Sequence, residues 1–106
     1  MTREQILDCL LGNAGSGLWI MAALKLNGKP INKERLREIT NSHFLSKKGD
    51  AYDLPIRSRH TLDQMTARLE GAGLVEVFGV GRAKMYSLSE LGHEIIRFSQ
   101  LQDRGN

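Results

Sequence analysis

The residues best suited to chemistry lie on one short segment, residues 58–70. Leu62, Met65 and Leu69 recur there at helical spacing and predict a buried face. The opposite face carries side chains with forked hydrogen-bonding ends, since an Arg guanidinium matches the edge of guanine and a Gln amide matches the edge of adenine. This face therefore has the residue types needed to read base pairs. Its members are Arg59, His60, Asp63, Gln64, Ala67 and Arg68.

Other polar residues nearby can contact phosphate. Ser58 is a good N-cap, and with Thr61 it can hydrogen-bond a phosphate near the helix start, where N–H groups and the helix dipole favour anions. Arg82 and Lys84 follow an apolar run, and cations at such a place can track the backbone or enter the minor groove. Asp63 repels phosphate unless it pairs with a neighbouring Arg or accepts from cytosine.

A further group of cations precedes the helix. Lys47, Lys48 and Arg57 lie in or beside a run of polar and turn-forming residues that ends at Pro55. We interpret residues 41–57 as an inserted basic loop and these cations as a second candidate phosphate contact. A loop of this length inside a compact domain is usually functional or disordered.

Each of these features has a plainer interpretation. Arg59 and Arg68 also fit the solvated face of an amphipathic helix, which is the more common case for a helix considered alone. His60 fits a polar surface residue better than a pH switch or a ligand. Lys47 and Lys48 are most often just part of a solvated loop. The binding interpretation therefore depends on the elements that surround the helix.

The sequence contains no pattern typical of an enzyme. His43, His60 and His93 lack metal-ligand spacing, and Cys9 has no partner motif. The run from Gly79 to Gly81 lacks a third glycine and precedes a strand, so a dinucleotide site is not expected. No Ser-His-Asp pattern or phosphate-binding loop is present. We predict no catalysis, no cofactor and no metal.

The composition fits one globular domain over residues 1–106. The chain is 41% hydrophobic and 25% charged, with a formal net charge of +3 that is compatible with nucleic acid but does not require it. A single cysteine excludes an intrachain disulfide and suits a reducing compartment. The start lacks a signal-like apolar core, and the run from Leu18 to Leu26 is too short to span a bilayer. We expect a cytoplasmic protein with no membrane segment.

The first half of the chain is predicted to be helical. A capping box of Thr2 and Gln5 opens a helix over residues 1–14. Residues 18–27 form a second helix that is apolar nearly all round, so it and Trp19 belong to the core or to a subunit interface. Asn32 caps a third helix, stapled by Ile31 and Leu36, that ends near residue 43 or 45.

The second half is predicted to hold one hairpin between helices. Gly71 and Gly73 supply left-handed positions that end the helix over residues 58–70. Strands over residues 74–78 and 83–88 flank a flexible tip at residues 79–82. Ser89 caps a last helix with Leu91, Ile95 and Phe98 inward. Residues 102–106 have nothing to bury and are expected to be frayed.

Two stretches of the chain resemble winged-helix regulators of the MarR and PadR type. Residues 58–75, SRHTLDQMTARLEGAGLV, resemble their recognition helix and its exit into the first wing strand. The second stretch is residues 82–92, in which YSLSELG at residues 86–92 resembles the start of the helix that follows their wing. The resemblance implies a mainly α fold with a small β-hairpin, a winged helix-turn-helix. The long segment at residues 41–57 departs from the short turn that this family uses there.

The resemblance implies a sequence-specific regulator of transcription that binds double-stranded DNA. Residues 58–70 would enter the major groove, and the wing at residues 79–84 would lie on the backbone or in the minor groove. A homodimer is expected, because operators are commonly two-fold and two apolar surfaces need partners. Those surfaces are the helix around Trp19 and the last helix, with Ile96, Phe98 and Leu101.

Two other functions remain open at this point. A winged helix can also serve as a protein-interaction module, for example in an effector of a mobile element or phage. RNA binding is less favoured, because Phe78 is the only aromatic residue near the proposed surface and unpaired bases need stacking platforms.

Overall fold

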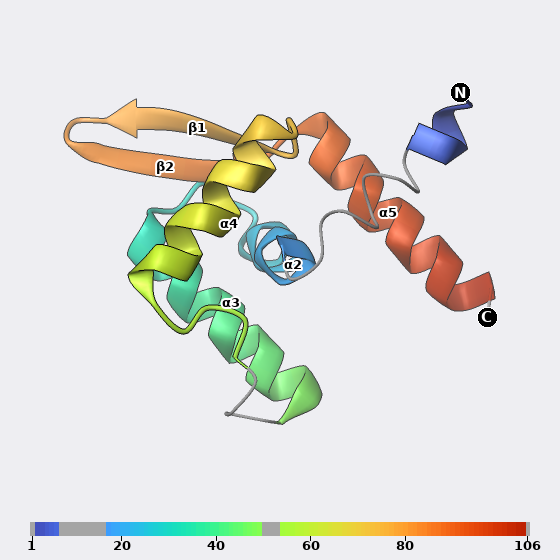
Figure 1. The fold of residues 1–106 in the computed structure, drawn as a ribbon, viewed down its shortest axis with the longest axis horizontal. Coiled ribbons are helices and arrows are strands. Elements are labelled where there is room, and N and C mark those ends of the chain that lie inside the picture. The colour runs from blue at the N-terminus through green and yellow to red at the C-terminus, as the bar shows by residue number, and fades with distance from the viewer. Residues whose placement is uncertain (1, 7–16, 50–53, 106) are drawn as a thin grey trace.

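The computed structural model of the chain describes residues 2–6, 17–49 and 54–105 (Figure 1). Its labelled elements are α2 (Gly17–Asn27), α3 (Lys33–Lys48), α4 (Arg59–Gly71), β1 (Val75–Val80), β2 (Ala83–Leu88) and α5 (Glu90–Gly105). The two strands pair antiparallel and project to one side of the helices, away from α5 (Figure 1). The predicted fold class, mainly helical with a small hairpin, is confirmed.

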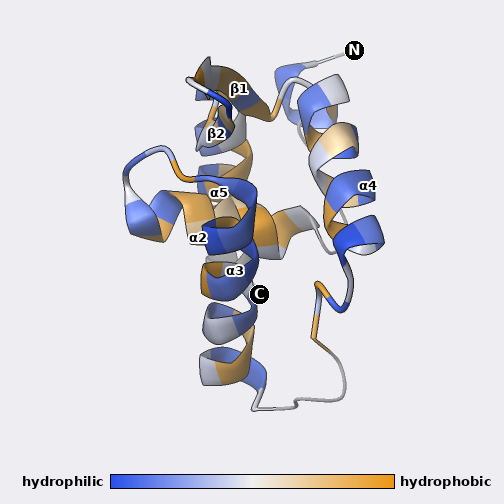
Figure 2. Ribbon diagram, turned by 90° about the vertical axis from the view of Figure 1, so that its left-hand side faces the viewer, coloured by the Kyte–Doolittle hydropathy of each residue, from blue (hydrophilic) through white to orange (hydrophobic). Residues whose placement is uncertain are grey.

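Helix α2 lies at the centre of the fold. Its side chains Ile20 and Met21 are completely buried, and α3, α4, β2 and α5 all pack against it. Leu36 of α3, Leu62 of α4 and Ile95 of α5 complete the same core. Figure 2 shows the hydrophobic colour over most of α2 and the polar colour on much of α4. The prediction that this apolar helix belongs to the core is confirmed.

Helix α3 begins as the sequence predicts but continues further. The Asn32 side chain accepts a hydrogen bond from the Arg35 N–H at 2.9 Å, so Asn32 is the N-cap. The helix runs to Lys48 and ends at Gly49, whose φ of 68° lies in the left-handed region that glycine favours. The expected end near residue 43 or 45 was therefore wrong.

The interpretation of residues 41–57 as an inserted loop was also wrong for its first half. Leu36, Thr40 and Phe44 form a buried row at four-residue spacing, which carries the helix past residue 41. The Trp19 ring packs edge-on against Phe44, with ring centroids 4.9 Å apart. These contacts stabilise the additional turns, so Lys47 and Lys48 lie in a helix and not in a loop.

The connection from α3 to α4 is anchored where it is described. Ile56 is completely buried, and the Asn41 amide binds the Ile56 backbone at both ends: it donates to the carbonyl at 2.8 Å and accepts from the N–H at 3.2 Å. Residues 50–53 of the expected loop lie outside the described residues. The start of α4 is therefore held directly against α3.

Helix α4 ends in a tight turn that begins β1. Gly73, with φ 75°, donates its N–H to the Glu70 carbonyl, and the Leu74 N–H bonds to the Leu69 carbonyl. These two bonds form the Schellman arrangement, which needs one left-handed residue. Gly73 supplies it as predicted. Gly71 does not, because it is still part of the helix and has no positive φ.

The hairpin is longer than the sequence predicted. Gly79 and Val80 pair with Lys84 and Ala83 as part of the strands, so they do not belong to a flexible tip. The turn reduces to Gly81, with φ 62°, and Arg82. At its base, Tyr86 exchanges two backbone hydrogen bonds with Ile31, at 2.8 and 3.1 Å. The hairpin is thus joined to the connection between α2 and α3.

Both ends of the chain are helical where the structure describes them. The capping box is confirmed, because Thr2 and Gln5 exchange backbone-to-side-chain bonds at 2.9 and 3.1 Å. Residues 3–6 are helical, and the rest of the helix expected over residues 1–14, with Cys9, lies outside the described residues. Helix α5 extends through Gly105, so the frayed tail expected at residues 102–106 was wrong for residues 102–105, and residue 106 lies outside the described residues. The sequence between Gly92 and Gly105 contains neither glycine nor proline, the residues that disfavour a helix most.

The start of α5 requires a glycine. A Cβ atom at Gly92 would lie 2.2 Å from the Leu74 carbonyl oxygen and 2.9 Å from a Leu88 methyl carbon. We therefore expect Gly92→Ala to destabilise the fold by about 1–3 kcal/mol or more, since backbone must move. The measurement is the free energy of unfolding in urea. Gly71→Ala is the matched control, because its Cβ would meet nothing within 4 Å; it should be neutral or stabilising by up to about 1 kcal/mol.

Candidate nucleic-acid interface

Helix α4 turns its polar face to solvent. Leu62 and Leu69 are buried, Met65 packs against the same core, and Thr66 is also buried on this side. The opposite face is exposed, as the helical spacing predicted. Its exposed residues are Arg59, His60, Asp63, Gln64, Ala67 and Arg68. The helix therefore presents the predicted set of base-reading side chains on its outer surface.

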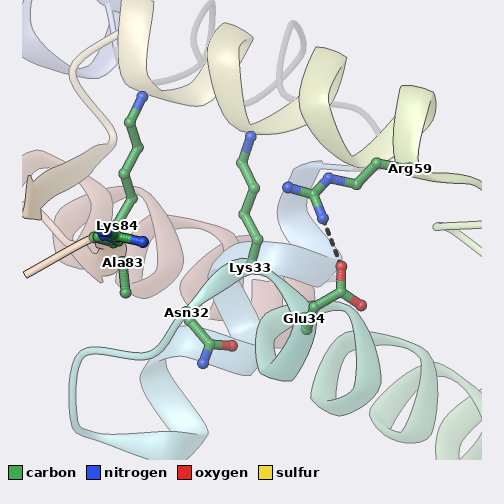
Figure 3. Close-up of a pocket in the computed structure, with 7 residues that line it drawn as sticks. Asn32, Lys33, Glu34, Arg59, Ala83 and Lys84 are labelled. Atoms are coloured by element: carbon green, nitrogen blue, oxygen red, sulfur yellow. Dashed lines mark hydrogen bonds and ion pairs between the residues drawn. The ribbon is translucent and has the colours of Figure 1, made fainter.

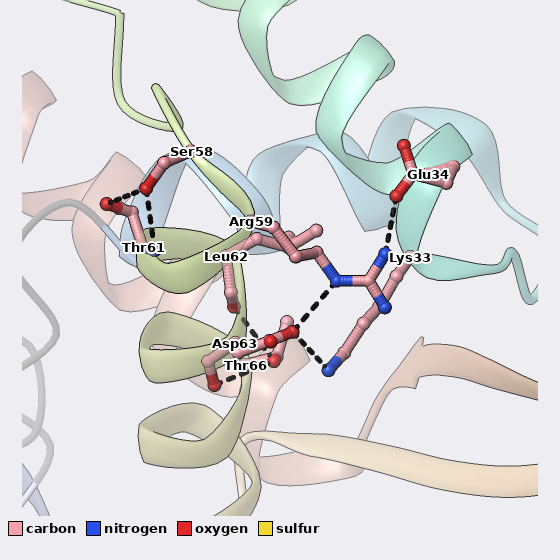
Figure 4. Close-up of polar contacts among 8 residues, drawn as sticks. All are labelled: Lys33, Glu34, Ser58, Arg59, Thr61, Leu62, Asp63 and Thr66. Atoms are coloured by element: carbon pink, nitrogen blue, oxygen red, sulfur yellow. Dashed lines mark hydrogen bonds and ion pairs between the residues drawn. The ribbon is translucent and has the colours of Figure 1, made fainter.

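Ser58 is the N-cap of α4. Its backbone is extended, and its hydroxyl accepts a hydrogen bond from the Thr61 N–H at 3.1 Å. The Ser58 and Thr61 hydroxyls also lie 3.1 Å apart (Figure 4). The predicted cap is confirmed, and both hydroxyls remain at the start of the helix, where an anion would meet unsatisfied N–H groups.

A network of four charged side chains joins α4 to the start of α3. The Arg59 Nε donates to Asp63 Oδ1 at 3.2 Å, and the Lys33 Nζ donates to the same oxygen at 2.7 Å. The Arg59 Nη1 donates to Glu34 Oε1 at 2.6 Å. Figure 4 shows Asp63 between the two cations and Glu34 on the far side of the guanidinium. Asp63 is therefore balanced by cations, which resolves the repulsion expected from the sequence.

The network shifts the acid–base properties of its members in one direction. The hydrogen bond from Lys33 is the main reason why the pKa of Asp63 is lowered. The same bond is the main reason why the pKa of Lys33 is raised, and the hydrogen bond to Asp63 raises the pKa of Arg59. All three shifts favour the charged forms. At neutral pH Lys33, Arg59 and Asp63 are thus all charged.

A cleft separates the start of α3 from α4 and the hairpin. It has a volume of about 410 Å³, and its lining residues are Asn32, Lys33, Glu34, Arg59, Arg82, Ala83 and Lys84. In Figure 3 the side chains of Lys33 and Lys84 extend toward α4, while Arg59 reaches from α4 toward Glu34. Neither Arg82 nor Lys84 forms an ion pair with any residue that the structure describes.

The cleft brings together only some of the predicted site residues. Arg59, Arg82 and Lys84 meet there, whereas Lys47 and Lys48 lie roughly 20 Å from Lys33 along α3, given the helical rise per residue. These two cations suit the negative end of the helix dipole. The backbone carbonyl of Arg57 accepts a hydrogen bond from Arg37 at 3.1 Å, next to the start of α4.

Sequence reasoning missed Lys33 and Glu34. Both stand directly after the Asn32 cap, and the contacts they make reach residues 25 to 30 positions away. Helical spacing relates residues within one element, so it carried no signal for this pairing across two helices.

Other kinds of site find no support in the described residues. No group of three or more metal-ligating side chains comes together there. Among the same residues, no helix has the length and apolar character needed to cross a membrane. Phe78 is 45% exposed on the hairpin, and Tyr86 is buried, so the described aromatic side chains do not form a platform beside the cleft.

Comparison with known proteins gives one relative of high similarity. The DNA-binding protein TubR of Bacillus cereus is 34% identical over 102 residues, which cover 92% of this chain and 85% of that protein. No protein-family model matches the chain.

Solved structures show the same fold. A mutant of the type III plasmid segregation protein TubR has a TM-score of 0.63 at 23% identity, covering 98% of this chain and 95% of that one. TubR bound to 24 bp of tubC from Bacillus thuringiensis serovar israelensis pBtoxis has a TM-score of 0.62 at 23% identity, covering 96% of each chain. These similarities confirm the predicted winged helix-turn-helix.

The charge network predicts a pH-dependent contribution to stability. Since the pKa of Asp63 is lowered from its ordinary 3.8, its contribution is complete above pH 3.8 and is lost as the pH falls through the lower folded-state value. We expect Asp63→Asn to lower the urea midpoint at neutral pH and to show a smaller deficit at about pH 2, because the wild-type carboxylate takes up a proton as the pH falls. A deficit that is equal at both pH values would contradict this, and 1 M NaCl should reduce it at neutral pH by screening.

Proposed function

Because the chain belongs to the TubR family of DNA-binding proteins, we propose that it binds double-stranded DNA in a sequence-specific manner. Helix α4 enters the major groove, and the tip of the hairpin lies on the backbone or in the minor groove. The family is TubR and not MarR or PadR, although the fold implied by the earlier resemblance is correct. The observation that carries the proposal is the convergence of Arg59, Arg82 and Lys84 on one cleft beside the exposed face of α4.

The side chains divide into two roles. Arg59 and Gln64 stand in the N-terminal half of α4, the part of a recognition helix that usually reaches base edges, and they read sequence. Arg82 and Lys84 lie on the hairpin and fix the position of the protein on the backbone. Ser58, Thr61, His60 and Arg68 flank these contacts, and Arg57 precedes the helix start. Lys47 and Lys48 lie at the far end of α3 from the cleft, so they would contact only DNA that extends past the cleft.

The biological role that we propose follows the family. One solved relative is named for type III plasmid segregation, and another is TubR bound to 24 bp of tubC. We propose that this chain recognises a DNA site of that kind, so that its binding serves the segregation of a plasmid. Regulation of transcription, which the sequence first suggested, is the second candidate. The recognition-helix and wing segments that resemble transcription regulators favour it.

The two roles of the side chains can be separated by mutation. A preferred sequence is first selected from random duplex DNA. We expect Arg59→Ala and Gln64→Ala each to lose about 1–3 kcal/mol of discrimination between the preferred and a random duplex. Arg82→Ala should weaken both duplexes alike and reduce the slope of log K against log salt by about 0.9. The measurement is a fluorescence-anisotropy titration at several salt concentrations.

Lys25 is exposed on α2 and does not line the cleft, so Lys25→Ala also removes one positive charge and should change neither quantity by more than the error. Equal effects of all three variants on both duplexes would contradict the division of roles. No binding of the wild-type chain to random duplex, even at low salt, would favour a protein-interaction module.

We further propose that the chain binds DNA as a homodimer through the exposed end of α5. Of the expected interface residues, Ile96 is buried in its own chain and Trp19 packs on His43 and Phe44, so both are engaged within one chain. Leu101 is 66% exposed on α5, and Leu26 is 64% exposed at the end of α2. Light scattering should give the mass of two chains for the wild type and for Leu26→Lys, and of one chain for Leu101→Lys. The reverse pattern would place the interface on α2, and a wild-type monomer at high concentration would refute the dimer.

A further inference from the structure

Glu34 is an unexpected residue for a surface that receives DNA. It stands in the first turn of α3 and is the one carboxylate among the residues that line the cleft, beside the cations Lys33, Arg59, Arg82 and Lys84. Within the described residues its partner is Arg59, at 2.6 Å. A phosphate that approached these cations would also approach Glu34, and two anions repel one another.

The two carboxylates bind different parts of the Arg59 guanidinium. Asp63 accepts from Nε, while Glu34 accepts from Nη1. A guanidinium has five N–H groups, and its forked contact with guanine can use the Nη1 and Nη2 end. Asp63 occupies neither of these nitrogens. Glu34 binds one of them, so it is the carboxylate that occupies the end through which Arg59 would contact a base edge.

The two carboxylates also differ in what happens when Arg59 moves. Asp63 stands one turn along the same helix and keeps a second cation, Lys33, at 2.7 Å. It can therefore remain beside Arg59 in a complex without bringing unbalanced negative charge to the DNA. Glu34 belongs to another helix and has no second partner among the described residues. Displacing Arg59 leaves its carboxylate, with the side chain 64% exposed, facing the incoming phosphates.

We propose that Glu34 is an intramolecular competitor of DNA for Arg59. DNA must displace the Glu34 carboxylate from Nη1, whereas Asp63 stays in place and positions the guanidinium. This inference rests on the proposed DNA binding and assigns a residue that limits its affinity. The competing pair lies at the surface, with side chains 57% and 64% exposed, so each displacement has a modest free-energy cost.

The proposal gives Glu34→Gln an effect opposite to that of a damaging mutation. Loss of a carboxylate in the first turn of α3 weakens a favourable interaction with the helix dipole, so the fold should become slightly less stable. DNA binding should nevertheless become about two- to fivefold tighter at low salt for the preferred duplex, where the released Arg59 contacts a base edge, and the gain should be smaller for a random duplex. The gain should shrink at high salt, since screening weakens the pair that is removed.

The test is an anisotropy titration of wild type, Glu34→Gln, Arg59→Ala and the double variant. Glu38→Gln is the matched control, because it removes the same charge from the same helix, where Glu38 pairs with Arg35 at 3.0 Å away from the cleft. We expect Glu38→Gln to leave affinity within twofold of the wild type. In the Arg59→Ala background, Glu34→Gln should have no larger effect than this control. Glu34→Ala repeats the measurement with a second side chain.

Each contrary result has a separate meaning. Equal gains from Glu34→Gln and Glu38→Gln would show an effect of net charge and overturn the proposal. A gain that persists undiminished without Arg59 would show direct repulsion of phosphate, which also overturns it. If the wild-type chain binds DNA and either of these two results is found, the proposed role of Glu34 is overturned but the proposed DNA binding is not. A wild-type chain that binds no duplex would overturn the proposed function, and this inference with it.

Discussion

The enclosure of α2 is the constraint on which the rest of the structure depends. A helix with so few polar side chains must be covered on nearly all sides, and α3, α4, β2 and α5 share that task. Gly17 shows how close the packing is, because a Cβ there would lie 2.9 Å from a Leu69 methyl carbon of α4. Leu62 and Leu69 of α4 pack in the core that surrounds α2. The opposite face of α4 is therefore left exposed to solvent. The exposed polar face of α4 is thus a consequence of how the core is filled.

The same packing decides where the hairpin lies. The Ile31–Tyr86 bridge joins it to the segment that precedes α3, and the Ser89 hydroxyl donates to the Gly73 carbonyl at 2.6 Å while it caps α5. The hairpin is therefore attached to the segment before α3 through Tyr86, and the residues that precede and follow it are joined to each other through Gly73 and Ser89. A two-stranded hairpin alone is marginally stable in water, so these attachments are what allow Arg82 and Lys84 to stand beside α4 in a defined position.

Much of the fold could be predicted from the sequence because its signals are local. The Asn32 and Ser58 caps, the capping box at Thr2, and the inward Leu62 and Leu69 each depend on residues within a few positions. The errors came from tertiary contacts that local signals do not contain. Helix α3 continues past residue 45 because Phe44 packs on Trp19 and Asn41 binds Ile56, although its last turns are polar enough to suggest a loop. Gly79 and Val80 suggest a flexible tip when read alone, but cross-strand pairing keeps them in the hairpin.

The candidate site shows the same limit in its electrostatics. The sequence identified which side chains α4 would expose, and it indicated that Asp63 needs a cation. It did not indicate which one, because Lys33 comes from α3 and reaches Asp63 only after both helices pack on α2. From the sequence alone, Arg59 is expected to be free to contact DNA because it is an exposed cation on α4. In the structure, however, it forms ion pairs with two carboxylates. The number of positive charges on such a face therefore overstates its attraction for phosphate, and what matters is which cations lack a partner. In the described cleft those are Arg82 and Lys84, on the hairpin, while Arg59, which we propose reads a base, is paired with two carboxylates of its own chain.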